Sequence, residues 1–230
     1  MYDAIFITGS VITPKRTQFF TPSQRLTHTI DCAKSIRKHF KTPYIVLTEG
    51  SELSNDQRIQ LKQHFDVVLE YSNDEEVQKA IHSPNIGLGE AKLLELCIEY
   101  LLRKFDKLEI PIFKTSLDAP TGFAPQIFKI TSRYSLANDF DIKEYELNKY
   151  NFLPEVCMGM DVYCTQLYSI PYKSIDEFLG VLKNIPKMLT DNSHPIEELF
   201  YRLITKDKVH VMKHLGLDGR LSYNGTIIKK

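Results

Sequence analysis

The sequence has no excess of charge of either sign, because 29 lysines and arginines are matched by 29 aspartates and glutamates. Without a net charge, no long-range field draws the chain to nucleic acid or to an anionic membrane, so we expect neither as a partner. Any site for an anion must therefore be local. The 230 residues are 43% hydrophobic and 25% charged, which is typical of a globular protein with one sizeable core.

The sequence also lacks paired cysteines and a targeting segment. Its four cysteines occur singly, with no C-x-x-C, which favours buried free thiols in a reducing compartment over disulfides or a metal site. The N-terminal MYDAIFITGS enters a strand-like run without the basic flank and long apolar stretch of a signal peptide. No run approaches the roughly 18 apolar residues of a membrane-spanning helix. We therefore expect a soluble, cytoplasmic protein, and the sequence leaves its oligomeric state open.

Short apolar runs alternate with amphipathic stretches over the first two-thirds of the chain. The predicted strands are AIFIT at 4–8, PYIVLTE at 43–49, DVVLEY at 66–71 and QIFKIT at 126–131. Strands separated by helices of this length indicate βαβ units and a mostly parallel sheet covered on both faces. The predicted fold class is α/β, a nucleotide-binding α/β/α sandwich.

Capping signals and apolar spacing predict the helices between these strands. Thr21 with Gln24, and Ser54 with Gln57, form capping boxes at two helix starts. The first of these helices has an apolar face formed by Leu26, Ile30, Ala33, Ile36 and Phe40. A long helix within 87–105 has an inward face formed by Leu94, Ile98, Leu101 and Phe105.

The regular alternation of predicted strands and helices ends after residue 142. A strand is predicted at 161–171, short helices at 174–185 and 194–204, and strand and turn at the end of the chain. We expect a single domain in which residues 1–141 bind a nucleotide and residues 142–230 form the second wall of a cleft. In open α/β sheets the ligand lies beyond the carboxyl ends of the strands.

Small and polar residues follow three of the predicted strands. They are Thr8, Gly9 and Ser10 in the first, Glu49, Gly50 and Ser51 in the second, and Ser132, Arg133 and Tyr134 in the fourth. Such residues let a planar or phosphorylated ligand reach backbone N–H groups. Ordinary turn chemistry explains any one of the three equally well, but three together favour a ligand site.

Standard nucleotide-binding motifs are missing. GLGEAK at 87–92 has two glycines of a dinucleotide-binding fingerprint but lacks the third, and it does not directly follow a clear strand. No G-x-x-x-x-G-K-[ST] occurs in the sequence. These absences argue against a Rossmann dehydrogenase and a P-loop enzyme.

A family resemblance is carried by seven segments that span almost the whole chain. They are FITGSVITPKRTQFFTPSQRLTHTIDCAKSIRKHF, YIVLTEGS, LGEAKLLELCIEYLL, FKITSRYSL, VYCTQLYSIP, IEELFYRLI and LGLDGRLSYNG. In this order they resemble glycosyltransferases of large DNA viruses of algae, which look like GT-A-fold sugar-nucleotide transferases. The family pattern has a Lys and then Gly-Arg-Tyr on its central strand. Lys129, Arg133 and Tyr134 match it, whereas Ser132 stands where glycine is usual.

The resemblance implies a nucleoside diphosphate sugar as donor and leaves two assignments for its diphosphate. In most GT-A enzymes an Asp-x-Asp at the end of the central strand holds a divalent cation such as Mn²⁺ or Mg²⁺ there. Here that strand ends in Lys129 and Arg133, and a guanidinium fork matches phosphate oxygens, so we favour cationic side chains. The competing assignment uses Asp139 and Asp141, which point the same way in an extended segment, as a metal site. The same pair also fits a solvated turn or helix cap.

Acidic helix starts supply the candidate bases. An inverting transferase needs a carboxylate that takes the proton from the acceptor hydroxyl. HPIEELF, with Glu197 as the first candidate and Glu198 as the second, resembles the acidic helix start that holds the base of many GT-A enzymes, although carboxylates favour helix N-termini for dipole reasons alone. Glu90 is a candidate contact for ribose or sugar hydroxyls, and Arg25 for phosphate.

The predicted function is transfer of a sugar, hexose or pentose, from a nucleoside diphosphate sugar to a hydroxyl of a glycan or glycoprotein. Residues 1–141 then form the donor half and 142–230 the acceptor half, in host cytoplasm if the protein is viral. One alternative is a nucleotidyltransferase that makes the activated sugar, for which GSVITPKRT offers Lys15 and Arg16 but only one glycine. The other is a non-catalytic module that binds carbohydrate or nucleotide through some of its 12 tyrosines and 13 phenylalanines.

Overall fold

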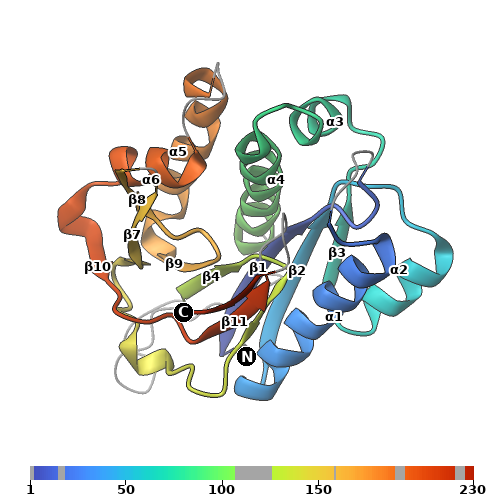
Figure 1. The fold of residues 1–230 in the computed structure, drawn as a ribbon, viewed down its shortest axis with the longest axis horizontal. Helices are drawn as coiled ribbons and strands as arrows, with labels where there is room; N and C mark the ends of the chain where they lie inside the picture. The colour runs from blue at the N-terminus through green and yellow to red at the C-terminus, as the bar shows by residue number, and fades with distance from the viewer. Residues whose placement is uncertain (1–2, 15–18, 107–125, 158, 190–194, 221–225) are drawn as a thin grey trace.

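A seven-stranded sheet forms the centre of the protein (Figure 1). The computed structural model describes residues 3–14, 19–106, 126–157, 159–189, 195–220 and 226–230. The sheet order is β10-β6-β9-β4-β1-β2-β3. Its strands are β1 (Ala4–Ser10), β2 (Pro43–Glu49), β3 (Val67–Glu70), β4 (Gln126–Ile130), β6 (Tyr150–Phe152), β9 (Leu167–Pro171) and β10 (Val209–Val211). Every neighbouring pair is parallel except the two that involve β9, which runs opposite to β4 and β6.

Apart from the α-helices, the other described elements are two smaller sheets and three short 3₁₀ helices. The three-stranded sheet contains β5 (Tyr134–Leu136), β11 (Leu217–Arg220) and β12 (Ile227–Lys229). The two-stranded sheet is the hairpin of β7 (Pro154–Cys157) and β8 (Met160–Tyr163). The 3₁₀ turns are η1 (Ile142–Glu144), η2 (Tyr172–Ser174) and η3 (Lys206–Lys208).

Helices cover both faces of the central sheet (Figure 1). They are α1 (Pro22–His39), α2 (Asn55–Lys62), α3 (Glu75–Ile81), α4 (Ile86–Asp106), α5 (Ile175–Met188) and α6 (Ile196–Leu203). One core cluster joins the sheet to α1, α2 and the three-stranded sheet, and the other joins it to α4, α5 and α6. Alternate residues of β1 feed the two clusters, since Phe6 lies in the first and Ile5 and Ile7 lie in the second.

The helix starts and apolar faces form as the sequence predicts. Thr21 with Gln24 and Ser54 with Gln57 make complete capping boxes at the starts of α1 and α2. The predicted apolar residues of α1 and of α4 are all buried. Burying a side chain of this kind stabilises the fold by about 1.5–3 kcal/mol, so these faces hold the helices onto the sheet.

The prediction of one strand at 161–171 is wrong. The segment forms β8 and β9 in two different sheets, with a break at 164–166. In the break, the N–H of Cys164 donates to the carbonyl of Leu153 at 2.8 Å, and the carbonyl of Gln166 accepts from the N–H of Thr131 at 2.8 Å. The backbone of the break is therefore bonded to two other segments, and the chain changes sheet there.

The cysteine prediction holds for three residues and fails for one. All four thiols are free, and Cys32, Cys97 and Cys164 are buried, but Cys157 at the end of β7 is exposed. Burial raises the pKa of Cys32 and of Cys97 to about 12. Among the described helices, none is long and apolar enough to cross a membrane.

Candidate functional site

The strand order creates a switch point between β1 and β4. From β1 the sheet continues through β2 to β3 on one side, while β4 lies on the other side. Ligands of open α/β sheets bind beyond the carboxyl ends of the strands at such a point. Gly9, near the end of β1, and Arg133, just after β4, are both partly exposed there.

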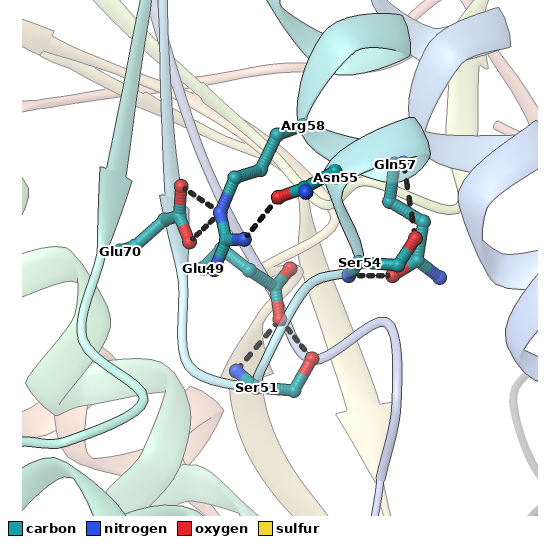
Figure 2. A network of polar contacts seen from close by, with 7 residues as sticks. All are labelled: Glu49, Ser51, Ser54, Asn55, Gln57, Arg58 and Glu70. Carbon is teal, nitrogen blue, oxygen red and sulfur yellow. Dashed lines mark hydrogen bonds and ion pairs between the residues drawn. The ribbon is translucent and has the colours of Figure 1, made fainter.

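Glu49 at the end of β2 ties two loops together. Its carboxylate accepts hydrogen bonds from the hydroxyls of Ser10 and Ser51, from the N–H of Ile12 at 3.0 Å and from the N–H of Ser51 at 2.8 Å. Figure 2 shows the side chain of Ser51 on this carboxylate, beside the ion pair of Arg58 with Glu70. Complete burial raises the pKa of Glu49, and the four hydrogen bonds oppose that rise.

The loop residues predicted to bind nucleotide are therefore mostly internal. Thr8, Ser10, Glu49 and Ser51 are buried, and the carboxylate of Glu49 accepts four hydrogen bonds from the protein itself. We assign Glu49 to the positioning of the loops after β1 and β2. Of the residues predicted on these two strand ends, Gly9 alone is partly exposed.

Arg25 of α1 and Arg133 lie close to each other beside Glu49. Burial and, after it, the charge of Arg133 lower the pKa of Arg25 to about 10, and the charge of Glu49 opposes the shift. Arg25 is buried, and its Nε donates to the carbonyl of Val11 at 2.7 Å. Burial also lowers the pKa of Arg133, against the charges of Tyr134 and Glu90.

The guanidinium of Arg133 has unused donor capacity. Its buried Nε has no hydrogen-bond partner within the described part of the chain. Leaving a buried charged donor unpaired costs free energy, as does placing two guanidinium groups near each other. An anion bound at Arg133 would offset both costs, so the arrangement can accept an anionic ligand.

Lys129 of β4 is internal and paired. Its side chain is 3% exposed, its ammonium forms an ion pair with Glu90 of α4, and it also donates to Thr131 Oγ1 at 2.8 Å and to the carbonyl of Thr165. An ammonium group has three donors, and these three contacts use them all. The structure thus separates the two predicted phosphate-binding cations, since Lys129 is satisfied by the protein and Arg133 is not.

Glu197 lies in the first turn of α6, on the other side of this cluster. Its Oε1 accepts from Thr165 Oγ1 at 2.9 Å. Burial raises the pKa of Glu197, the neighbouring charge of Glu90 raises it further, and Thr165 and Lys129 lower it. Glu197 is partly exposed as a residue, and its raised pKa makes its carboxylate a stronger base than an ordinary glutamate.

The remaining residues predicted after β4 belong to the core. Tyr134 is 2% exposed in β5, and a Cβ added at Gly219 would stand 2.1 Å from its ring. Burial raises the pKa of Tyr134 to about 12. Ser132 is also buried. A ligand that reaches Arg133 therefore does not reach these side chains without a rearrangement.

The Asp139 and Asp141 pair lies away from the strand carboxyl ends. Its neighbour Asn138 accepts from Lys38, and Phe140 packs on His39, both in the last turn of α1. Because α1 runs back from the end of β1 to the start of β2, this contact lies at the opposite edge of the sheet.

The carboxylates of the pair have local roles. Asp141 caps η1 by accepting from the N–H of Lys143 at 2.9 Å, and exposed Asp139 lies 3.7 Å from His214. The structure thus agrees with the cap alternative for Asp141. No group of three or more potential metal ligands occurs among the described residues, and the cationic Arg133 after β4 does not fit a divalent cation.

Sequence reasoning missed Thr165 and Tyr168. Thr165 lies in the break between β8 and β9, and Tyr168 is the register partner of Lys129 across β4 and β9. Tyr168 is fully buried, and its hydroxyl has no hydrogen-bond partner within the described residues. Burial, followed by the charges of Glu90 and Glu197, raises its pKa well above the ordinary value. No local pattern identifies either residue, because only the antiparallel pairing brings them to Lys129.

Comparison with known proteins bears on the architecture. No protein-family model matches the chain, and no curated protein matches its sequence. Among solved structures, it is similar to the apo form of the glycosyltransferase GlyE of Streptococcus pneumoniae TIGR4, with a TM-score of 0.54 and 10% identity over 93% of this chain. A second GlyE structure gives a TM-score of 0.51 at 10% identity, again over 93% of this chain. The chain spans 46% of GlyE in both cases.

The fold is GT-A-like. The chain is an α/β/α sandwich of the nucleotide-binding type with a mostly parallel sheet, as its sequence predicts. It is also similar to a glycosyltransferase involved in the glycosylation of the major capsid of PBCV-1, with 10% identity, a TM-score of 0.47, and coverage of 92% of this chain and 82% of that one. That score is too low to bear on family or function, so membership of the viral family stays a prediction.

Proposed function

We propose that the protein is a glycosyltransferase that uses a nucleoside diphosphate sugar. Arg133 is the observation that supports this most, because it is a partly exposed cation beside Arg25 with a buried donor left unpaired. In the proposed site it binds the diphosphate of the donor at the switch point between β1 and β4. The donor half is residues 1–141, and we propose uracil nucleotides as the first to test.

Glu197 is the proposed base. The acceptor hydroxyl gives its proton to this carboxylate as its oxygen forms a bond to the anomeric carbon of the donor sugar. The bond between that carbon and the phosphate oxygen breaks, and the electron pair leaves with the diphosphate. Arg133 offsets the negative charge that grows on the leaving group. Glu197 and Thr165 belong to residues 142–230, the proposed acceptor half, and the acceptor class is a glycan or glycoprotein hydroxyl.

A nucleotide titration followed by a turnover assay tests the proposal. Calorimetric titration with UDP and GDP, each with and without Mn²⁺, is expected to show diphosphate binding that does not require the metal. A panel of sugar nucleotides is then expected to be hydrolysed slowly without acceptor. Replacing Glu197 by Gln is expected to lower turnover about 10²- to 10⁴-fold while nucleotide binding persists. Glu177→Gln, at an exposed side chain of α5, is the matched control.

Other results would identify the alternatives. Release of pyrophosphate from a nucleoside triphosphate and a sugar phosphate would establish a nucleotidyltransferase instead. Lys15 and Arg16, which that alternative uses, lie outside the described residues. Binding of a sugar nucleotide with no turnover would indicate a binding module. Absence of binding to every nucleotide would remove the transferase proposal.

A further inference from the structure

A continuous set of hydrogen bonds joins Glu90 to Glu197. Lys129 binds the carboxylate of Glu90 and the carbonyl of Thr165, and the hydroxyl of the same Thr165 donates to Glu197 Oε1 at 2.9 Å. The four residues come from α4, β4, the break before β9 and α6. This set, Glu90–Lys129–Thr165–Glu197, is called the carboxylate relay below.

We propose that Lys129 is a positioning residue, which acts through Thr165 to orient the carboxylate of Glu197 and keep it ionised, and that it does not contact the donor diphosphate. The inference rests on the proposed function, in which Glu197 is the base. It changes the role that the sequence alone assigns to Lys129. It also adds Thr165, which no sequence pattern indicates.

Lys129 is buried and has no donor left for a phosphate. The side chain of Lys129 is 3% exposed, and its ammonium lies 5.6 Å from the centre of the Tyr168 ring. All three of its donors are used within the protein. A diphosphate oxygen would have to displace Glu90, Thr131 or the Thr165 carbonyl to reach it, whereas Arg133 needs no such exchange.

Charged and polar groups from several elements surround the carboxylate of Glu197. Glu90 faces it from α4, Lys129 from β4, Tyr168 from β9 and Thr165 from the break before β9. On its own helix, the neighbouring carboxylate of Glu198 is paired with Arg202. Glu90 disfavours the ionised form of Glu197, while Lys129 and the Thr165 hydroxyl favour it. Lys129 therefore opposes the effect of Glu90 and binds the segment whose Thr165 hydroxyl donates to the base.

The test measures the ionisation of Glu197 directly, by ¹³C NMR of the full chain labelled at the glutamate carboxyl carbon. Glu197→Gln assigns the resonance. Lys129→Met is expected to move the titration midpoint of Glu197 to higher pH, because a favourable cation is lost. Glu90→Gln is expected to move it to lower pH, because an unfavourable anion is lost. Thr165→Val is expected to raise it relative to Thr165→Ser, which keeps the hydroxyl.

An ion pair between α5 and α4, the helix that carries Glu90, provides the control variants. Lys183 binds Glu99 of α4 at 2.7 Å, away from the relay. Lys183→Met and Glu99→Gln therefore remove a more exposed ion pair that also involves α4, and neither is expected to move the Glu197 midpoint. The acid limb of turnover against pH, measured with whichever sugar nucleotide is hydrolysed, is expected to move with the NMR midpoint in each relay variant.

Opposite shifts in Lys129→Met and Glu90→Gln support the proposal, and so does a shift in Thr165→Val if one of the charge variants does not fold. Equal shifts, or no shift in any relay variant that keeps its circular dichroism spectrum, overturn it. Because NMR needs no substrate, failure of the two proposals can be distinguished. Opposite shifts without turnover of any sugar nucleotide would support the linkage and remove the transferase assignment.

Discussion

Gly87 in the first turn of α4 packs directly on Ile196, the first residue of α6. A Cβ added at Gly87 would stand 3.0 Å from the Cβ of Ile196 and 3.2 Å from Asn85 Oδ1, which is tighter than ordinary contact. The missing side chain lets the starts of the two helices approach each other. Glu90 and Glu197 follow this contact near the starts of α4 and α6, so the close approach at Gly87 helps to position both carboxylates.

Substituting Gly87 by Ala is therefore expected to push α6 away from α4. The displacement moves Glu197 relative to the donor, and a shift of about 1 Å can cost up to about a hundredfold in turnover. Gly180→Ala on α5 is the control, because a Cβ there meets nothing within 4 Å. That control is expected to add about 0.5–1 kcal/mol to the unfolding free energy and to leave turnover unchanged. Equal turnover in both variants would contradict the prediction.

Replacing Arg133 by Gln is expected to weaken binding of UDP. Hydrogen bonds to charged groups are worth about 1.5–3 kcal/mol, which corresponds to roughly ten- to hundredfold in affinity. Binding of uridine, which has no phosphate, is expected to stay the same. Arg37→Gln is the control, since that exposed guanidinium pairs with Asp66 near the other end of α1. Calorimetry measures all three proteins, and an equal loss in both variants would show that Arg133 has no special role.

Glu49 gives the unfolding free energy a predictable pH dependence. Its pKa is raised in the folded protein above the ordinary 4.5, so the folded state holds a proton that the unfolded state has released. The stability that this group contributes is therefore complete below 4.5 and is lost as the pH rises through the raised value. Urea unfolding between pH 4 and pH 8 measures this change.

The Glu49→Gln variant is expected to lack that pH-dependent loss. In this variant the NH₂ of the amide replaces an oxygen that accepts hydrogen bonds, so at least one buried donor loses its acceptor. The loss is expected to lower the unfolding free energy by about 1–3 kcal/mol. Glu70→Gln, the register neighbour on β3 that pairs with Arg58, is expected to cost less than about 1 kcal/mol and to keep the parent pH dependence. A pH dependence unchanged by Glu49→Gln would show that another group causes it.

Cys157 is expected to be the one thiol that iodoacetamide labels in the folded protein. It is exposed, whereas Cys32, Cys97 and Cys164 are buried, and burial raises the pKa of Cys164 to about 11 and of the other two to about 12. Thiolates are the reactive species, so these three react only after unfolding. Mass spectrometry should find one adduct at pH 8 and four in denaturant. An adduct at Cys32 in the folded protein would contradict the prediction.

The sequence predicts the fold well where structure is local. The capping boxes of Thr21 and Ser54 start α1 and α2 because the cap residue and its partner are three positions apart. The elements it misses, α3, β5, β6 and β7, are short. The strands β5 and β6 depend on partners far along the chain, since Tyr134 pairs with Gly219 and Asn151 pairs with Ser169.

The site is predicted less fully than the fold, for the same reason. The sequence places Arg133 and Glu197 on elements that meet at the strand carboxyl ends, and the structure brings them into one charged cluster with Glu90. The sequence does not reveal that the side chain of Lys129 is buried, because burial of a strand residue depends on which elements cover its face of the sheet. The carbonyl of Thr165 reaches Lys129 only through the antiparallel β9.

The reversed direction of β9 constrains how this protein can diversify. The loop that follows β4 and the loop that precedes β9 are joined by the 2.8 Å hydrogen bond from the Thr131 N–H to the Gln166 carbonyl. Extra residues in either loop would break this hydrogen bond and move Thr165 away from Glu197. Among the strands that the structure describes, β7 and β8 pair only with each other, so the length of this hairpin can change without displacing the central sheet. Relatives with other acceptors are thus expected to differ in the length of that hairpin and to agree in the length of the β4–β9 corner.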